Sequence, residues 1–242
     1  MRIDQRLENQ LRPVKLTANI CEYAEGSCLV EFGKTKVFCT ATYEAQGPKW
    51  LQNTGQGWIT AEYGMLPRST QSRMKRDKIA TGGRTQEISR LIGRSLRSAV
   101  NMDKMGERQI TLDCDVINAD GGTRTAAITG GFVALALCLE KLVKVNEIKT
   151  MPLINYIAAV SVGLKNDQAL LDLNYDEDSS IGTDMNFVMT DLGHFVEMQG
   201  TAEQEPFTKS QLQQMIDVAH QGCTELFKKQ SELVGHILKP RL

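Results

Sequence analysis

Residues 109–126 have the sequence QITLDCDVINADGGTRTA, which contains the clearest structural pattern in the chain. Apolar and polar residues alternate over 109–119, which predicts a β-strand with one face toward a core. Residues 120–122 supply a turn, and the mainly apolar run over 125–145 predicts a buried helix. The sequence therefore predicts a strand that passes through a glycine turn directly into a core helix.

Strand-like and helical patterns alternate on both sides of this stretch. β-Branched residues and turn signals predict strands over 14–19, 26–32, 35–45, 156–164, 169–173, 185–190 and 195–200. Helical spacing of apolar residues predicts helices over 85–102 and 208–229, and the polar, basic residues 66–83 predict a long loop. This order is typical of an α+β chain with mixed β-sheets and packed helices. We expect one domain over residues 1–242, with an N-terminal part of about 1–150 and a C-terminal part of about 151–242.

The composition is that of an ordinary globular protein. The 242 residues are 41% hydrophobic and 24% charged, which excludes disorder, collagen and coiled coil as descriptions of the whole chain. The longest nearly charge-free run, 125–139, is shorter than the ~20 apolar residues of a membrane helix, so we expect no membrane span. The first six residues contain no apolar run, so we expect no secretory signal. Six cysteines without a CxxC pair favour free thiols in a reducing compartment, and we expect a cytoplasmic protein.

Charge is divided unevenly along the chain although the net charge is only −1. Residues 68–97 contain nine basic side chains against two acids, whereas residues 172–205 contain nine acids and no lysine or arginine. The basic block can bind a polyanion and the acidic block a metal ion. The alternative is that both blocks are solvated faces whose charges cancel in the fold.

Residues 120–125, DGGTRT, are the strongest local signal for a binding site. The glycines let the backbone turn sharply, and Thr123 lies near a helix start, where the N–H groups and the dipole favour an anion. Arg124 adds a guanidinium that fits two phosphate oxygens. A second glycine-led helix start with an arginine, GGRT at 82–85, indicates that Arg84 and Arg124 hold one anion from two sides. The alternative is two ordinary helix caps.

Residues 176–186, DEDSSIGTDMN, form an acidic segment around a glycine. Asp178 and Asp184 are six residues apart across that glycine, so their carboxylates can converge on one Mg²⁺ or Mn²⁺. One of them can equally donate or accept a proton. A solvated acidic hairpin loop is the alternative interpretation.

The remaining candidates favour structural roles. No serine or cysteine has a partner histidine in a recognisable motif, so we expect no covalent nucleophile. The three histidines lack metal-ligand spacing, and we expect them at the surface or on helices: His194, His220 and His236. Trp50 and Trp58 flank a segment rich in glycine and glutamine, and we expect them to pack in the core.

Long strings in the chain resemble the ribonuclease PH family of bacterial phosphorolytic exoribonucleases. The resemblance runs nearly end to end and includes GQGWITAEYGMLPRST at 55–70, GRTQEISRLIGRSL at 83–96 and TLDCDVINADGGTRTA at 111–126. It implies the ribosomal-protein-S5 domain 2-like fold, called the exoribonuclease PH fold, and a homohexamer built as a trimer of dimers. It also implies an enzyme that uses inorganic phosphate and Mg²⁺ to trim the 3′ ends of precursor tRNA and other RNAs. Nucleoside diphosphates are released, and the reverse reaction adds nucleotides.

The same resemblance assigns roles to nine residues by motif match. The phosphate site is assigned Arg84, Gly122, Thr123 and Arg124. The catalytic, metal-associated positions are Asp178 and Asp184. The basic loop that binds RNA and contacts other subunits is assigned Arg68, Arg73 and Arg76. One departure from the family pattern is Asp4-Gln5-Arg6, where Asp-Gly-Arg is usual.

Our hypothesis is that Asp184 is a metal ligand and that Asp178 is either a second metal ligand or a general acid. The sequence does not distinguish between these roles of the two aspartates. Two other functions stay open. A hydrolytic, metal-dependent nuclease would use the aspartates but needs no phosphate clamp. A catalytically silent RNA-binding ring subunit, like those in eukaryotic exosomes, usually lacks these arginines and aspartates, all of which are present here.

Overall fold

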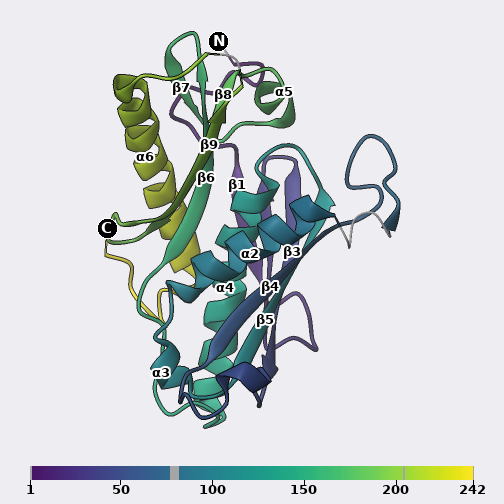
Figure 1. Cartoon of the computed structure of the whole chain (residues 1–242), viewed down its shortest axis with the longest axis vertical. Helices are drawn as coiled ribbons and strands as arrows, with labels where there is room; N and C mark the ends of the chain where they lie inside the picture. Colours follow the sequence, from purple (N-terminus) through teal and green to yellow (C-terminus); the bar gives the residue numbers. More distant parts are fainter. Residues whose placement is uncertain (1, 77–81, 204, 242) are drawn as a thin grey trace.

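The computed structural model describes residues 2–76, 82–203 and 205–241, and within these residues the strands form two sheets (Figure 1). The first sheet has the order β1-β2-β3-β5-β4 and consists of β1 (Val14–Ala18), β2 (Gly26–Phe32), β3 (Thr35–Glu44), β4 (Trp58–Met65) and β5 (Gln109–Asn118). The second has the order β7-β6-β8-β9 and consists of β6 (Ile157–Lys165), β7 (Gln168–Leu171), β8 (Thr183–Thr190) and β9 (Phe195–Ala202).

The helices cover the sheets and fill the space between them. Within the described residues they are α2 (Gly83–Arg97), α3 (Met102–Met105), α4 (Thr123–Lys144), α5 (Tyr175–Asp178) and α6 (Lys209–Val234), with a 3₁₀ helix η1 (Lys49–Leu51). Helix α4 packs on β2, β3 and β5 and also contacts β6 and α6, so it lies where the two sheets meet (Figure 1). Helix α2 covers β4, and α6 covers β6 and β7. Strands β4 and β5 run parallel because α2 connects them, whereas all other neighbouring strands are antiparallel.

Helix α4 forms the centre of the core. Among the described helices it alone is long and apolar enough to cross a membrane, with a mean hydropathy of 1.8, but 83% of that window is buried inside the protein. One continuous apolar core joins it to both sheets, with Val30 and Cys114 from the first and Val160 and Phe187 from the second. The apolar surface of α4 is therefore used for packing, as the sequence predicts.

The architecture confirms the predicted α+β class, and most predicted elements lie within two residues of the observed ones. Strand β4 was not among the predicted strands. The helix predicted over 85–102 ends earlier, at Arg97, because Asn101 caps the separate short helix α3 with its side chain. Residues 66–75 form a loop as predicted, and residues 77–81 of the predicted loop lie outside the described residues.

The prediction that Trp50 packs in the core is wrong. Trp50 is 63% exposed on η1, and its ring packs edge to face on the ring of Trp58, with centroids 4.9 Å apart. Trp58 is half-buried because the Arg97 guanidinium covers its ring, 4.3 Å from the centroid. The three histidines are exposed as predicted, and the six cysteines are unpaired.

Candidate active site

The glycine turn between β5 and α4 brings two parts of the site into direct contact. Gly121 and Gly122 have φ angles of +75° and +65°, a left-handed conformation that glycine adopts without steric cost. A Cβ atom at Gly121 would lie 2.5 Å from the carbonyl oxygen of Leu173, and within 3.0 Å of the backbone of Asn174 and Tyr175. The turn therefore packs against the backbone that leads into α5, where the acidic segment begins.

Helix α4 starts at this turn with its backbone donors uncapped by the residue before it. Gly122 is the N-cap, so no side chain caps the helix at that position. The hydroxyl of Thr123 instead lies 2.8 Å from the hydroxyl of Tyr63, a buried residue of β4. Of the two ordinary helix caps that were the alternative interpretation, the one expected from Thr123 at the start of α4 is therefore absent. Uncapped N–H groups and the positive end of the helix dipole favour an anion at this position.

The two glycine-led helix starts differ in their backbone. Helix α2 begins at Gly83 after Gly82, whose φ of −67° is ordinary, and a Cβ at Gly83 would meet nothing within 4 Å. Arg84 lies in the first turn of α2 and is exposed. Only the α4 start therefore requires glycine for its conformation, whereas α2 contributes an exposed cation, Arg84.

Arg124 is held in place by a small polar network. Its Nη1 atom lies 3.2 Å from Oε1 of Gln199 on β9 and 3.6 Å from Oε1 of Glu87 on α2. Gln199 in turn donates to Glu87 over 2.9 Å. The side chain of Arg124 is 18% exposed, so its guanidinium is oriented but still reaches solvent. The network joins α2, α4 and β9 around one cation.

Asp178 and Asp184 lie within the field of both arginines. Loss of hydration raises the pKa of Asp178, the charge of Asp184 raises it further, and Arg84 and Arg124 oppose the rise. Loss of hydration also raises the pKa of Asp184, with Arg124 acting against it. The structure thus brings the predicted residues of α2, α4, α5 and β8 close enough for the two arginines to interact electrostatically with both carboxylates.

The carboxylate pair fits a divalent cation with few protein ligands. Within the described ranges, no group of three His, Cys, Asp or Glu side chains is arranged to hold a metal ion. Mg²⁺ commonly binds through one or two carboxylates and keeps several waters or substrate oxygens as its other ligands. Asp178 and Asp184 supply that donor set.

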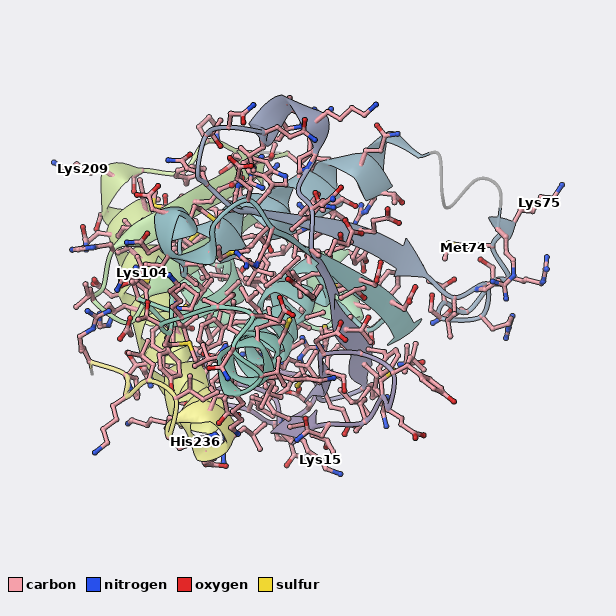
Figure 2. The ribbon with its side chains drawn as sticks, turned by 90° about the horizontal axis from the view of Figure 1, so that it is seen from below. Lys15, Met74, Lys75, Lys104, Lys209 and His236 are labelled. Atoms are coloured by element: carbon pink, nitrogen blue, oxygen red, sulfur yellow. The ribbon has the colours of Figure 1, made fainter. Side chains whose placement is uncertain are left out.

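The three arginines predicted to bind RNA lie on a separate projection. Arg68 and Arg73 are exposed on the loop after β4, and Arg76 is exposed directly after it. Figure 2 shows this loop, with Met74 and Lys75, extending from the body of the protein. The Arg68 side chain donates to the carbonyl of Gln71 over 2.9 Å. Arg76 borders an open cavity of about 720 Å³ that Tyr63 also lines. The basic loop therefore adjoins the anion site through Tyr63 but is not part of it.

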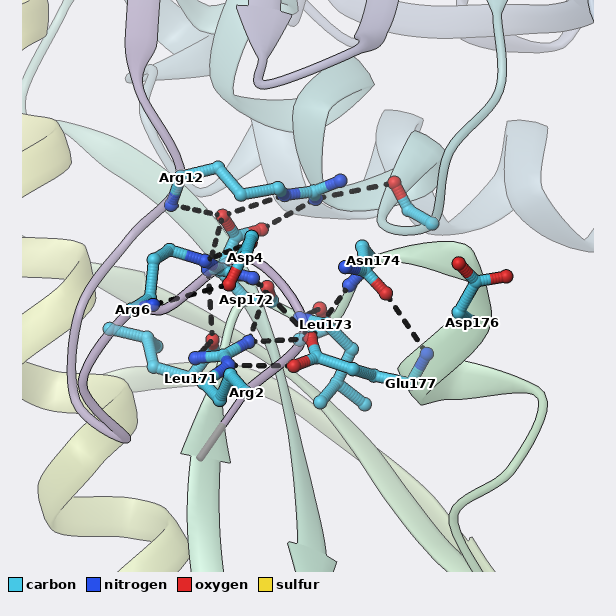
Figure 3. Close-up of polar contacts among 12 residues, drawn as sticks. Arg2, Asp4, Arg6, Arg12, Leu171, Asp172, Leu173, Asn174, Asp176 and Glu177 are labelled. Carbon is cyan, nitrogen blue, oxygen red and sulfur yellow. Dashed lines mark hydrogen bonds and ion pairs between the residues drawn. The ribbon is translucent and has the colours of Figure 1, made fainter.

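Sequence reasoning did not identify a buried ionic cluster behind the site (Figure 3). Arg2 forms a two-point pair with Glu177 at 2.7 and 2.6 Å, and Arg6 lies 3.3 Å from the same carboxylate. Arg12 pairs with Asp172 at 2.7 Å. Glu177 belongs to the acidic segment, but its charge is neutralised inside the protein. The only sequence signal is the density of arginine near the N-terminus.

Comparison with known proteins identifies the family. Residues 10–139 match the 3′ exoribonuclease family, domain 1, and residues 155–222 match domain 2 of the same family. The chain belongs to the 3′ exoribonuclease family. This membership confirms the resemblance seen in the sequence, and with it an enzyme that degrades RNA from the 3′ end.

Similar proteins extend over almost the whole chain. Ribonuclease PH of Bdellovibrio bacteriovorus is 69% identical over 239 residues, covering 99% of this chain and 98% of the relative. The exosome of Archaeoglobus fulgidus with RNA bound to the active site superposes with a TM-score of 0.80 at 20% identity, covering 94% of this chain and 92% of that one. Rice (Oryza sativa) Rrp46 has a TM-score of 0.70 at 20% identity, covering 97% of each chain. The two structures confirm the predicted exoribonuclease PH fold of this 3′ exoribonuclease family member.

Proposed function

We propose that this chain is a phosphorolytic 3′-to-5′ exoribonuclease in which the starts of α2 and α4 hold inorganic phosphate beside the RNA 3′ end. One observation carries the proposal. Arg84 and Arg124, one from each helix start, act on the same two carboxylates, Asp178 and Asp184. Phosphorolysis brings two anionic phosphate groups together, and oriented cations and N–H groups reduce their repulsion.

The reaction needs positioning and charge stabilisation from the protein, and no covalent intermediate. An oxygen of inorganic phosphate attacks the last phosphodiester phosphorus, the bond from that phosphorus to the 3′ oxygen breaks, and the 3′ oxygen takes up a proton. The products are a nucleoside diphosphate and an RNA shorter by one nucleotide. Arg84 and Arg124 bind and orient the phosphate, and the N–H groups around Gly122 and Thr123 donate to its oxygens. The reverse reaction adds a nucleotide from a nucleoside diphosphate.

Asp178 and Asp184 are the residues that would hold Mg²⁺ or Mn²⁺. Two neighbouring carboxylates that have lost part of their hydration repel each other, and a divalent cation would offset this repulsion. When bound there, such a cation would offset charge on the transferred phosphoryl group. We assign Asp184 as a metal ligand, and Asp178 as a second ligand or as the acid that protonates the 3′ oxygen.

The projecting basic loop supports binding of RNA. Arg68, Arg73 and Arg76 are exposed on a loop outside the anion site, so they suit attraction of the phosphate backbone without base recognition. RNA affinity should therefore fall steeply with salt. The proposed substrates are precursor tRNA 3′ ends and other RNAs, including rRNA. The proposed assembly is a homohexamer, a trimer of dimers, in the cytoplasm.

The deciding experiment is trimming of a short 3′-tailed RNA with Mg²⁺, with and without inorganic phosphate. We expect nucleoside diphosphates that appear only when phosphate is present. Nucleoside monophosphates formed without phosphate would establish the hydrolytic nuclease. Binding of the RNA without trimming would establish the silent RNA-binding subunit.

A further inference from the structure

Arg12 lies behind the active site, where it cannot reach a substrate. Its side chain is 3% exposed and that of its partner Asp172 is 1% exposed. The guanidinium donates to both carboxylate oxygens of Asp172, over 3.0 and 2.7 Å, and the backbone N–H of Arg12 donates to the same carboxylate over 2.8 Å (Figure 3). This geometry fixes the guanidinium in one orientation.

The same guanidinium also holds the glycine turn of the anion site. Arg12 donates to the carbonyl oxygen of Asp120 and, over 3.3 Å, to that of Gly121. Thr35, which is fully buried, supports the turn beside it. The Thr35 hydroxyl donates to the Gly121 carbonyl over 2.6 Å and accepts from the Asp120 N–H over 3.0 Å. The backbone immediately before Gly122 and Thr123 is therefore held by two buried side chains.

On its other side, Arg12 is joined to the acidic segment. Asp172 has a φ of +54°, a strained conformation for a residue other than glycine. Its carbonyl oxygen accepts hydrogen bonds from Arg2 and Arg6, over 3.2 and 3.0 Å. Two residues later, Asn174 caps α5, which ends at Asp178. Arg12 thus connects the turn that begins α4 with the segment that carries Asp178.

We propose that Arg12, supported by Thr35, is a positioning residue that fixes the glycine turn of the anion site relative to the acidic segment. The inference rests on the proposed function. A guanidinium presents five N–H donors in one plane and can hold a carboxylate and two carbonyl groups together, whereas a lysine ammonium is a single flexible point charge. Because in-line attack needs close alignment, a displacement of about 1 Å costs on the order of 10²-fold in rate.

The test is Arg12→Lys, which keeps the positive charge and removes the planar array of N–H donors. We expect kcat/KM for inorganic phosphate to fall on the order of 10²-fold, with a lower kcat and a higher KM for phosphate. The Kd for RNA should stay within about twofold, because the described hydrogen bonds of the Arg12 side chain go to Asp172, Thr35 and the glycine turn and not to the basic loop that attracts RNA.

The chain offers a matched control in Arg241→Lys. Arg241 donates to buried Asp191 from its backbone N–H (2.9 Å) and its Nε (3.1 Å), and its side chain also donates to the Ile154 carbonyl (2.7 Å). Asp191 directly follows the C-terminal end of β8, whereas Asp184 lies at the N-terminal end of that strand. We expect Arg241→Lys to lower thermal stability while kcat and both KM values stay unchanged. If the two lysine variants lose activity only in proportion to their stability, the inference is overturned.

A second pair of variants keeps the test decisive if Arg12→Lys does not fold. Thr35→Val removes the hydroxyl at nearly constant volume, and Thr35→Ser keeps it. We expect Thr35→Val to raise the KM for phosphate about tenfold or more, and Thr35→Ser to restore it. Equal values for the two variants would overturn the inference. If the wild type releases no nucleoside diphosphate in the presence of phosphate, the proposed function fails and the inference fails with it. If the wild type releases nucleoside diphosphates and Arg12→Lys does so with the same kinetic constants, only the inference is refuted.

Discussion

Replacement of Gly121 by alanine tests the contact between the glycine turn and the acidic segment. Gly121 has a φ of +75°, and a left-handed conformation costs an alanine about 1–2 kcal/mol. Its new methyl group would also lie 2.5 Å from the Leu173 carbonyl oxygen and 2.7 Å from the Asn174 carbonyl carbon. Both are backbone atoms, and forcing them apart costs about 1–3 kcal/mol. We therefore expect Gly121→Ala to lower the free energy of unfolding by about 2–5 kcal/mol.

Gly55 provides the matched control for backbone strain. Its φ is +73°, almost that of Gly121, but a Cβ there would meet nothing within 4 Å. Gly55→Ala should therefore cost only the conformational part, about 1–2 kcal/mol. Urea denaturation followed by circular dichroism measures both values, and a trimming assay with phosphate measures activity. Only Gly121→Ala should lower the rate of trimming, because only it displaces the turn from the segment leading to α5. Equal losses of stability and full activity in both variants would refute the close packing on which the site is built.

Three further predictions concern charged residues. Arg84→Ala should raise the KM for phosphate about tenfold or more with little change in the Kd for RNA, since loss of one charged hydrogen bond costs about 1.5–3 kcal/mol; equal loss of both would count against a phosphate-specific role. Asp184→Asn should abolish turnover and leave RNA binding, measured by fluorescence anisotropy, unchanged. Unaltered turnover would refute the assignment of Asp184 as a metal ligand. Burial and the charges of Glu62 and Asp115 raise the pKa of Asp113, so its carboxylate lowers stability above that pKa, and the effect disappears as acid protonates it. Asp113→Asn should therefore raise the free energy of unfolding by about 0.2–1 kcal/mol at pH 7 and leave it unchanged at pH 3. A stabilisation of the same size at both pH values would contradict this prediction.

The sequence predicted the parts of the site that depend on local order. The alternation over 109–119, the glycines after it and the apolar run beyond them describe β5, the turn and α4, because each is determined by residues close together in the chain. The acidic segment was also predicted as a unit. The family resemblance identified which of its carboxylates to assign to catalysis.

What the sequence could not predict depends on contacts between distant residues. Arg2 and Glu177 are 175 positions apart and Arg12 and Asp172 are 160 apart, so no local pattern shows that they pair and are buried. The departure at Gln5 has a structural counterpart, since its φ of +65° is a left-handed conformation that glycine would adopt without steric cost. The prediction that Trp50 packs in the core failed for a similar reason, because the exposure of this residue depends on where η1 lies relative to the first sheet.

The most direct test of the central claim follows the origin of the new bond. RNA is trimmed by the wild-type protein in the presence of ³²P-labelled inorganic phosphate and H₂¹⁸O, and the released nucleotides are separated. Attack by inorganic phosphate predicts nucleoside diphosphates that carry ³²P in the β-phosphate and no ¹⁸O from water. Nucleoside monophosphates that contain ¹⁸O and no ³²P would contradict it, because water rather than phosphate would then be the nucleophile.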